Sequence, residues 1–173
     1  MIIRNYLILC LTIFVANSPT LAQSDELFTI YLVRHSEKDH SSPNQSNLPL
    51  SLCGEQRSHA LSNFLSDVQL EAIYSTDFTR TLSTAQPTAT ARNLEIQIYD
   101  PSHLEEFSLT LVNNQQNALV VGHSNTTGYL AGFLIGEEGE DISLDKYDRI
   151  YQVVVSCNST KLQILHSSFE CDE

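Results

Sequence analysis

Hydrophobic and polar positions follow two different rhythms along this chain, and the two rhythms alternate. Short apolar runs, typical of buried strands, are separated by stretches with an apolar residue every three or four positions, which is typical of helices. The apolar runs predict strands at 28–33, 71–74, 94–99 and 118–121. The helical stretches are 54–66, 78–92, 101–113 and 126–135. This alternation predicts an α/β domain built around a mostly parallel sheet.

The end of the chain breaks the alternation. Two β-branched runs, 150–156 and 161–166, follow one another with only a short polar link between them, which predicts a closing hairpin. Segments 38–50 and 136–145 are polar or acidic and are expected to be surface loops. Pro87 lies inside the helical stretch 78–92, where a proline removes a backbone donor, so a kink or a break is expected there.

The first 22 residues have the layout of a cleavable secretory signal. Arg4 precedes an apolar run at 6–16, helix-breaking residues follow at 17–19, and Ala22 offers a small residue for cleavage. The apolar run is too short to cross a bilayer core, which needs about 20 residues. We therefore predict a signal peptide at 1–22, one mature domain at 23–173, and a secreted or periplasmic location.

The net charge of the chain limits the kinds of molecule that it is expected to bind. The chain has 9 basic and 21 acidic residues, a net charge of −12, and cleavage after Ala22 would remove Arg4 and lower this to −13. Such a protein should repel nucleic acid and anionic membrane surfaces. We expect no nucleic-acid partner and no membrane span after signal cleavage. An anionic substrate would have to be captured by a local cluster of positive charge.

Three cysteines remain after the predicted cleavage: Cys53, Cys157 and Cys171. An exported compartment permits disulfides, but an odd number leaves at least one thiol unpaired. A Cys157–Cys171 bridge near the C-terminus is one option, and the pairing stays open at this point. No two of these cysteines have the spacing of a zinc or redox motif.

The residues that follow the predicted strands are unusually rich in cationic and imidazole groups. Arg34 and His35 follow the first strand, Arg80 lies shortly after the second, and His123 follows the fourth. In open α/β sheets the ligand site lies beyond the carboxyl ends of the strands, so these four residues should meet at one edge.

Two arginines and two histidines suit phosphoryl transfer. Guanidinium groups present forked donors that match phosphate oxygens. A neutral imidazole can attack phosphorus and carry the phosphoryl group as phosphohistidine. Each residue alone would be weak evidence, because most polar residues at element ends serve caps or turns. Their combination at strand ends predicts a phosphate site.

Four segments resemble the histidine phosphatase (phosphoglycerate mutase-like) superfamily. They are Tyr31-Leu-Val-Arg-His-Ser-Glu-Lys38, Leu50-Ser-Leu-Cys-Gly-Glu-Gln-Arg57, Ile73-Tyr-Ser-Thr-Asp-Phe-Thr-Arg-Thr-Leu-Ser-Thr-Ala85 and Val120-Val-Gly-His-Ser-Asn-Thr127. The first is similar to the "RHxEK" form of the family's nucleophile motif, and the last is similar to its second-histidine motif. The resemblance follows the family order over nearly the whole predicted mature chain. It implies a three-layer α/β/α sandwich.

The resemblance also implies roles for these residues. His35 is the expected nucleophile, and Arg34, Arg80 and His123 are expected to form the phosphate pocket. Ser36 stands where the family most often has Gly or Ala, so its hydroxyl is a candidate to face the pocket.

A proton donor is harder to assign. Family enzymes commonly use a carboxylate after the third strand, and Glu105 resembles that position. Asp100, Glu106 and Asp77 are rivals for the role. An acid in the first turn of a helix is also favoured by the helix dipole alone, so Glu105 has a purely structural explanation as well.

The expected activity is therefore that of an exported, metal-independent phosphomonoester hydrolase without a cofactor. Its substrate would be a phosphorylated small molecule, an envelope glycan or a phosphoprotein. Two alternatives remain: a non-catalytic phosphoester-binding module on the same fold, and a phosphosugar mutase. The mutase is disfavoured because only residues 100–117 separate the third and fourth strands, which leaves no room for a lid that excludes water.

Overall fold

This computed structural model describes residues 27–171, which contain six strands and four helices joined by loops. In chain order they are β1 (Phe28–Arg34), α1 (Leu52–Phe64), β2 (Ala72–Ser75), α2 (Thr79–Arg92), β3 (Ile96–Ile98), α3 (Leu104–Asn114), β4 (Ala118–Gly122), α4 (Thr127–Ile135), β5 (Arg149–Val155) and β6 (Thr160–His166). The predicted signal peptide lies outside the described residues. Across 27–171, none of the helices is both long and apolar enough to cross a membrane.

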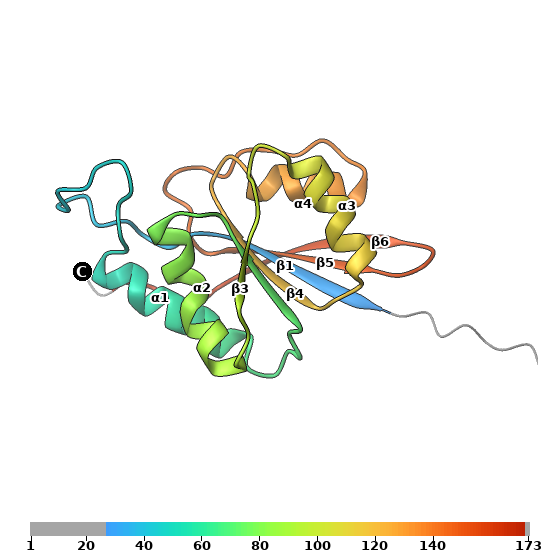
Figure 1. Cartoon of the computed structure of the whole chain (residues 1–173), viewed down its shortest axis with the longest axis horizontal. Coiled ribbons are helices and arrows are strands. Elements are labelled where there is room, and N and C mark those ends of the chain that lie inside the picture. The colour runs from blue at the N-terminus through green and yellow to red at the C-terminus, as the bar shows by residue number, and fades with distance from the viewer. Residues whose placement is uncertain (1–26, 172–173) are drawn as a thin grey trace, which may run out of the picture.

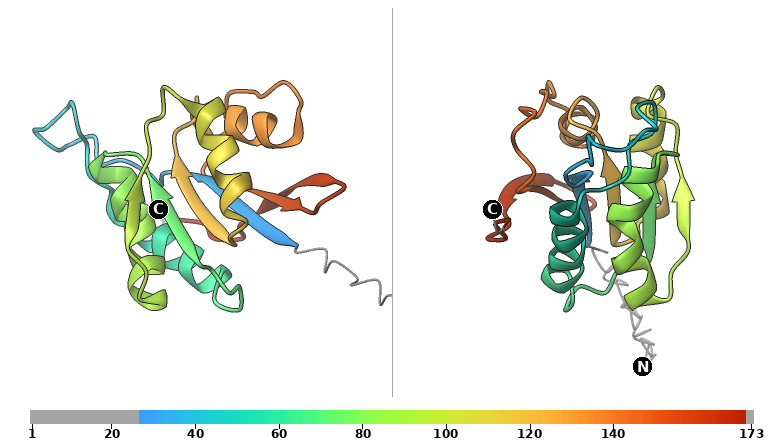
Figure 2. Two further views of the ribbon diagram at one scale, coloured as in Figure 1. Left: turned by 45° about the vertical axis from the view of Figure 1, so that its right-hand side comes forward. Right: turned by 90° about the vertical axis from the view of Figure 1, so that its left-hand side faces the viewer.

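All six strands belong to one sheet in the order β3-β2-β4-β1-β5-β6. The first four of these run parallel to one another, and β5 and β6 add an antiparallel hairpin beside β1. Helices α1 and α2 lie together on one face of the sheet, and α3 and α4 lie together on the other (Figures 1 and 2). The predicted α/β class with a mostly parallel sheet is confirmed.

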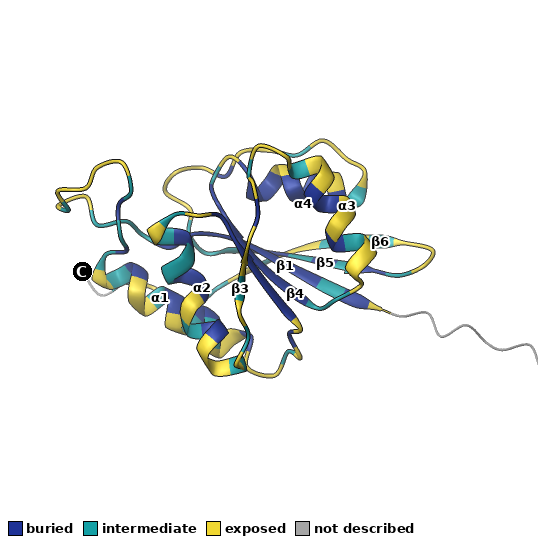
Figure 3. Ribbon diagram, viewed as in Figure 1, coloured by how far each residue is buried: buried dark blue, intermediate teal, exposed yellow. Residues whose placement is uncertain are grey.

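The core has two halves because side chains alternate across a strand. In β1, Ile30 and Leu32 point toward α3 and α4, whereas Tyr31 and Val33 point toward α1 and α2. The middle positions of the central strands are therefore apolar on both faces, as expected for a sheet that is covered on both sides. Figure 3 shows this burial, with the central strands dark and the β5–β6 hairpin more exposed.

Two expectations about the helices need correction. Helix α2 continues through Pro87 without a break, because its buried face, which includes Ala85 and Ala89, packs against the sheet and α1. That packing offsets a cost of roughly 3 kcal/mol for an internal proline. Helix α3 begins at Leu104, three residues later than predicted, because Asp100 accepts hydrogen bonds from the backbone and hydroxyl of Ser102 and holds a turn there.

The structure pairs Cys53 with Cys171 and leaves Cys157 free and exposed. The bridge considered between Cys157 and Cys171 is therefore wrong. After β6 the chain returns past the start of α1, which brings Cys171 within a Cα–Cα distance of 5.6 Å of Cys53 although 118 residues separate them in sequence. The bridge thus attaches the C-terminal segment to the first helix.

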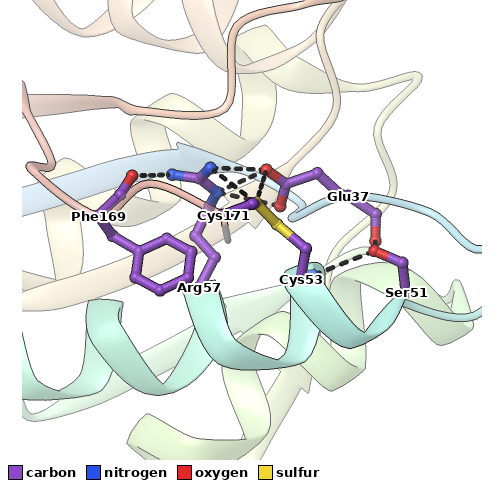
Figure 4. Close-up of a disulfide and its surroundings, with 7 residues drawn as sticks. Glu37, Ser51, Cys53, Arg57, Phe169 and Cys171 are labelled. Atoms are coloured by element: carbon purple, nitrogen blue, oxygen red, sulfur yellow. Dashed lines mark hydrogen bonds and ion pairs between the residues drawn. A yellow bond between two sulfur atoms is a disulfide. The ribbon is translucent and has the colours of Figure 1, made fainter. Parts of the chain in front are cut away.

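The side chains around this disulfide form a cluster in which the charged groups are paired (Figure 4). The Arg57 Nε atom donates to both carboxylate oxygens of Glu37, at 2.8 and 3.0 Å, and Nη1 donates to the Phe169 carbonyl at 3.1 Å. The guanidinium also lies over the Phe169 ring, 4.9 Å from its centroid. Gly54 is required nearby, because a Cβ there would lie 2.2 Å from the Glu37 carbonyl oxygen. The segment 50–57 therefore has a structural role that holds the loop after β1.

Candidate active site

Strands β1, β2 and β4 are parallel neighbours, so their carboxyl ends lie side by side. The His35 backbone N–H donates to the Gly122 carbonyl at 2.9 Å, which brings the two histidine-bearing turns together. Gly122 admits no side chain, because a Cβ there would lie 2.7 Å from the Tyr99 hydroxyl and 2.8 Å from the Thr126 hydroxyl. The tight junction places His35 and His123 with ring centroids 5.5 Å apart.

A cavity of about 460 Å³ opens at this edge. All four residues predicted from the strand ends line it: Arg34, His35, Arg80 and His123. Lys38 adds a further cation to the wall. The start of α4 also borders the cavity at Thr126, and a helix N-terminus contributes partial positive charge.

His35 is held as a neutral imidazole with one nitrogen available. The Nδ1 atom lies 2.7 Å from the Ser36 carbonyl, which can only accept, so Nδ1 carries the proton and Nε2 keeps its lone pair. Burial, with smaller contributions from the charges of Arg34, His123 and Arg80, lowers the pKa of His35 to about 3, although the hydrogen bond to the Ser36 carbonyl acts in the opposite direction. The side chain is thus a neutral imidazole at ordinary pH, with an Nε2 lone pair that is able to act as a nucleophile.

His123 is fixed by a chain of hydroxyl groups. Its Nε2 atom lies 2.9 Å from the Thr76 hydroxyl, which also lies 3.0 Å from the Thr81 hydroxyl. Among the described residues, the other ring nitrogen, Nδ1, has no hydrogen-bond partner. Burial, followed by the charges of Arg80, Arg34 and Lys38, lowers the pKa of His123 to about 4. The Thr76 hydroxyl donates to Thr81, whose own hydroxyl donates to backbone carbonyls, so His123 donates from Nε2 to Thr76. A neutral His123 then keeps a lone pair on Nδ1, and the protonated ring can donate from Nδ1 to an anion.

Within the described part of the chain, Arg80 has no partner of opposite charge. Its guanidinium stacks over the Phe78 ring at 4.4 Å from the centroid. No described residue accepts a hydrogen bond from its side chain, and its Nε atom is buried without a partner. Burial lowers its pKa, with a smaller contribution from the charge of Arg34. A buried cationic donor without a partner is costly in a protein, so this arrangement favours an anion in the cavity.

The Arg34 side chain binds a loop and also lines the cavity. Its Nη1 atom donates to the Leu144 and Lys146 carbonyls at 2.9 and 3.0 Å, and the guanidinium lies over the Tyr147 ring at 4.0 Å. Its Nε atom is buried and has no hydrogen-bond partner within residues 27–171. Arg34 therefore anchors the loop before β5 and keeps a free donor. Burial lowers its pKa.

None of the residues that line the cavity is an aspartate or a glutamate. Glu105 instead lines a neighbouring groove, with Glu106, and Asp100 lines a hollow beside β3. Asp77 is exposed at the end of β2 and does not line the cavity either. The structure thus brings none of the four candidate proton donors to the cavity wall. Pro101 and Ser102, which precede α3, line the cavity on this side, whereas Glu105 in the first turn of α3 lines the neighbouring groove.

Ser36 does not line the catalytic cavity. Its backbone N–H donates to the Thr84 hydroxyl at 3.0 Å, and Thr84 in turn donates to the Arg80 carbonyl at 2.8 Å. This small buried residue therefore connects the nucleophile turn to α2 and positions Arg80.

Sequence reasoning missed several residues of the site. Lys38 stands three residues after His35 in the quoted motif, and that position was the available signal. Thr76 carried no signal, because its role depends on the contact with His123, which is 47 residues away. Tyr147 lies in an acidic loop whose path over Arg34 cannot be read from the sequence.

One group within residues 27–171 has the spacing of a metal site: Glu37, Cys53 and Cys171. Its two sulfur atoms form the disulfide, and the Arg57 guanidinium lies 2.6 Å from the Glu37 carboxylate. The positive charge already present there disfavours a metal cation. The catalytic cavity offers nitrogen donors and cations, which suit an oxyanion.

Comparison with known proteins agrees with this chemistry. The family model of the histidine phosphatase superfamily (branch 1) matches residues 30–120, more than half of the chain. A search of curated protein sequences found no significant match.

Similar solved structures share the fold at low identity. One is the protein histidine phosphatase SixA complexed with tungstate, with a TM-score of 0.67, 19% identity, and coverage of 81% of this chain and 97% of that one. Another is the alpha-ribazole phosphatase from Shigella flexneri, with a TM-score of 0.67, 17% identity, and coverage of 84% and 100%. A third is the mycobacterial glucosyl-3-phosphoglycerate phosphatase, with a TM-score of 0.66, 12% identity, and coverage of 82% and 100%.

Proposed function

Because this chain belongs to the histidine phosphatase superfamily and is a phosphatase, we propose that it hydrolyses phosphomonoesters through a phosphoryl group carried on His35. The observation that carries the proposal is the combination of a neutral His35 with cationic donors that lack protein partners. The His35 Nε2 atom is available for attack, and the Nε atoms of Arg34 and Arg80 are buried without acceptors. A phosphate group would supply the missing acceptors.

The reaction would have two steps. First, His35 Nε2 forms a bond to phosphorus while the bond from phosphorus to the ester oxygen breaks and the alcohol leaves. Next, water attacks phosphorus, the N–P bond breaks, and the Nε2 lone pair is restored. Arg34, Arg80 and Lys38 would balance the charge on the phosphoryl oxygens, and His123, protonated when the phosphate is bound, would donate from Nδ1. The tungstate bound to one structural neighbour is an oxyanion, which supports an oxyanion pocket on this fold.

The lining of the cavity constrains the leaving group. Since no carboxylate lines it, the leaving oxygen would receive its proton from water or from His123. A strongly basic alkoxide is then a poor leaving group, so we expect aryl phosphates, acyl phosphates and phosphoramidates to react faster than alkyl phosphates. Glu105 would gain a role as general acid only if α3 moved toward the cavity.

Export is a further part of the proposal. The pattern at 1–22 predicts a signal peptide, and the Cys53–Cys171 disulfide suits an oxidising compartment such as a periplasm or an extracellular medium. N-terminal sequencing of protein recovered from an exporting host should begin near Gln23. Soluble protein that keeps Met1 and has reduced cysteines would contradict export.

A non-catalytic phosphoester-binding module remains a second candidate, because the missing carboxylate favours binding without turnover. Hydrolysis of 4-nitrophenyl phosphate by the purified 23–173 domain separates the two. We expect turnover that resists chelation and is abolished in His35→Ala. The exposed His59 on α1 provides a matched control, and His59→Ala should be as active as the wild type. Binding of the substrate without any release of nitrophenol would support the module. A phosphosugar mutase is disfavoured, since α3 is the only element between β3 and β4 and forms no lid.

A further inference from the structure

A second groove adjoins the catalytic cavity. Pro101 and Ser102 line both, so the two hollows share a wall. The groove measures about 440 Å³ and lies between the N-terminal end of α3 and the outer face of α4. This volume is in the range of small-molecule pockets.

The groove is lined by exposed apolar side chains. Tyr129 and Phe133 are four residues apart in α4 and so lie on one face of that helix, and they are 39% and 45% exposed. Leu104 and Pro101 complete the apolar surface. Single exposed apolar residues are ordinary, but an adjoining aromatic pair in a hollow beside a reactive centre is typical of a binding surface.

The charge of the groove is opposite to that of the cavity. Glu105 and Glu106 line it together with His103, whose ring pairs with the carboxylate of Asp100. Neither glutamate has a lysine or arginine partner within residues 27–171. Both acids also stabilise the dipole of α3, which explains their presence without a ligand. Whatever their origin, they make the groove unfavourable for a second anionic group.

Resting on the proposed function, we infer that this groove binds the leaving group of the substrate, and that the group is aromatic or bulky and apolar, without negative charge. Its continuity with the cavity at Pro101 and Ser102 argues for this occupant. A phosphoryl group beside His35 has its ester substituent outside the cationic cavity, and the groove is the adjoining apolar surface. The cationic cavity and the acidic groove then orient the substrate, with its phosphate in the cavity and its uncharged group in the groove.

The first test compares two substrates of the 23–173 domain. One is 4-tert-butylphenyl phosphate, which would fill the groove, and the other is acetyl phosphate, which is too small to reach it. In Tyr129→Ser and Phe133→Ser, the ratio of kcat/KM for the aryl substrate to that for acetyl phosphate should fall about tenfold, the effect of exposing one aromatic contact. Phe64→Ser is the matched control, because Phe64 on α1 is also 45% exposed and should leave the ratio unchanged.

The second test addresses charge. Wild-type protein should discriminate against 4-carboxyphenyl phosphate, and Glu105→Gln with Glu106→Gln should raise its kcat/KM relative to the tert-butyl substrate by about three- to fivefold, as expected for removal of exposed like charges. An unchanged ratio in every groove variant, with acetyl phosphate still hydrolysed in a His35-dependent reaction, would overturn this inference alone. No His35-dependent hydrolysis of any substrate would instead overturn the proposed function.

Discussion

Arg80 and Arg57 are both partly buried arginines, but they differ in what surrounds them. Arg57 donates to Glu37, the Phe169 carbonyl and the Cys171 sulfur, and it stacks on the Phe169 ring. Arg80 stacks on Phe78 and has no protein acceptor for any of its donors among the described residues. Both lie in motifs that resemble the same family. The comparison indicates that satisfied donors mark a structural arginine and unsatisfied donors mark a binding one.

The physical reason is the cost of a buried donor without a partner. A protein that only needs stability should pair such a group or place it in water. Around Arg80 and Arg34, the buried donors are left unpaired in the described structure, so that a substrate anion can accept hydrogen bonds from them. Around Arg57, the cost is removed within the fold by Glu37 and the C-terminal segment.

The largest expected effect is on activity at Arg80. In Arg80→Met, kcat/KM for 4-nitrophenyl phosphate should fall by about 10²–10³-fold, as expected for the loss of a preorganised donor to the transition state. The free energy of unfolding should stay the same or rise slightly, because methionine keeps an apolar contact with Phe78 and removes a buried donor that has no acceptor among the described residues. Steady-state kinetics and urea unfolding on the same preparation check both parts. A strongly destabilised but fully active variant would reverse the assignment.

The next effect is on stability at the disulfide. Cys53→Ser with Cys171→Ser should lower the free energy of unfolding by about 2–4 kcal/mol, because a long loop of the unfolded chain is released. Under conditions where the variant is folded, kcat/KM should stay within about twofold of the wild type. Cys157→Ser, which alters the free exposed cysteine, is the control and should change neither quantity. Equal stability of the double variant and the control would show that the bridge does not form in solution.

A smaller loss of stability is expected for Arg57 itself. Arg57→Met keeps much of the apolar stem but removes the ion pair with Glu37, and should cost about 2–3 kcal/mol, the range for hydrogen bonds to a charged partner. Thermal or urea unfolding measures the loss. Because Glu37 lies two residues after His35, a modest rise in KM is also expected. A fall in kcat/KM as large as that of Arg80→Met would remove the distinction between the two arginines.

The last expected effect is absent at neutral pH and appears only in acid: a pH dependence of stability that originates in the cavity. The pKa values of His35 and His123 are lowered from the ordinary 6.5 to about 3 and about 4. The unfolded chain therefore binds more protons than the folded chain between about pH 6.5 and pH 3, so the stability from these groups is complete above 6.5 and declines toward pH 3. In His35→Gln the decline should be shallower, as measured by urea unfolding at several pH values. An unchanged slope would show that His35 is not buried as a neutral group.

The strand-end residues could be predicted because parallel strands must end at a common edge. Arg34 ends β1, His35 follows it directly and His123 follows β4 directly, so their meeting depends on sheet topology alone. Glu105 could not be placed, since its position depends on where α3 begins, and a turn held by Asp100 shifts that start by three residues.

The remaining misses have the same kind of cause. Thr76 and Tyr147 act on His123 and Arg34 through contacts between segments far apart in sequence, and periodicity carries no information about such contacts. The pairing of Cys171 with Cys53 depends on the return of the chain past α1 after β6. The apolar pattern was sufficient for the layers of the fold, but it did not foresee that packing would carry α2 through Pro87.

The most direct test of the account is to trap the phosphoenzyme. Purified 23–173 protein would be mixed with a phosphorus-labelled aryl phosphate, quenched in alkali within milliseconds, and digested for mass spectrometry. We predict a phosphoryl group on His35 that survives alkali and is lost in acid, that forms in Arg57→Met, and that is absent in His35→Ala. A label on another residue, or undiminished turnover in His35→Ala, would contradict the account.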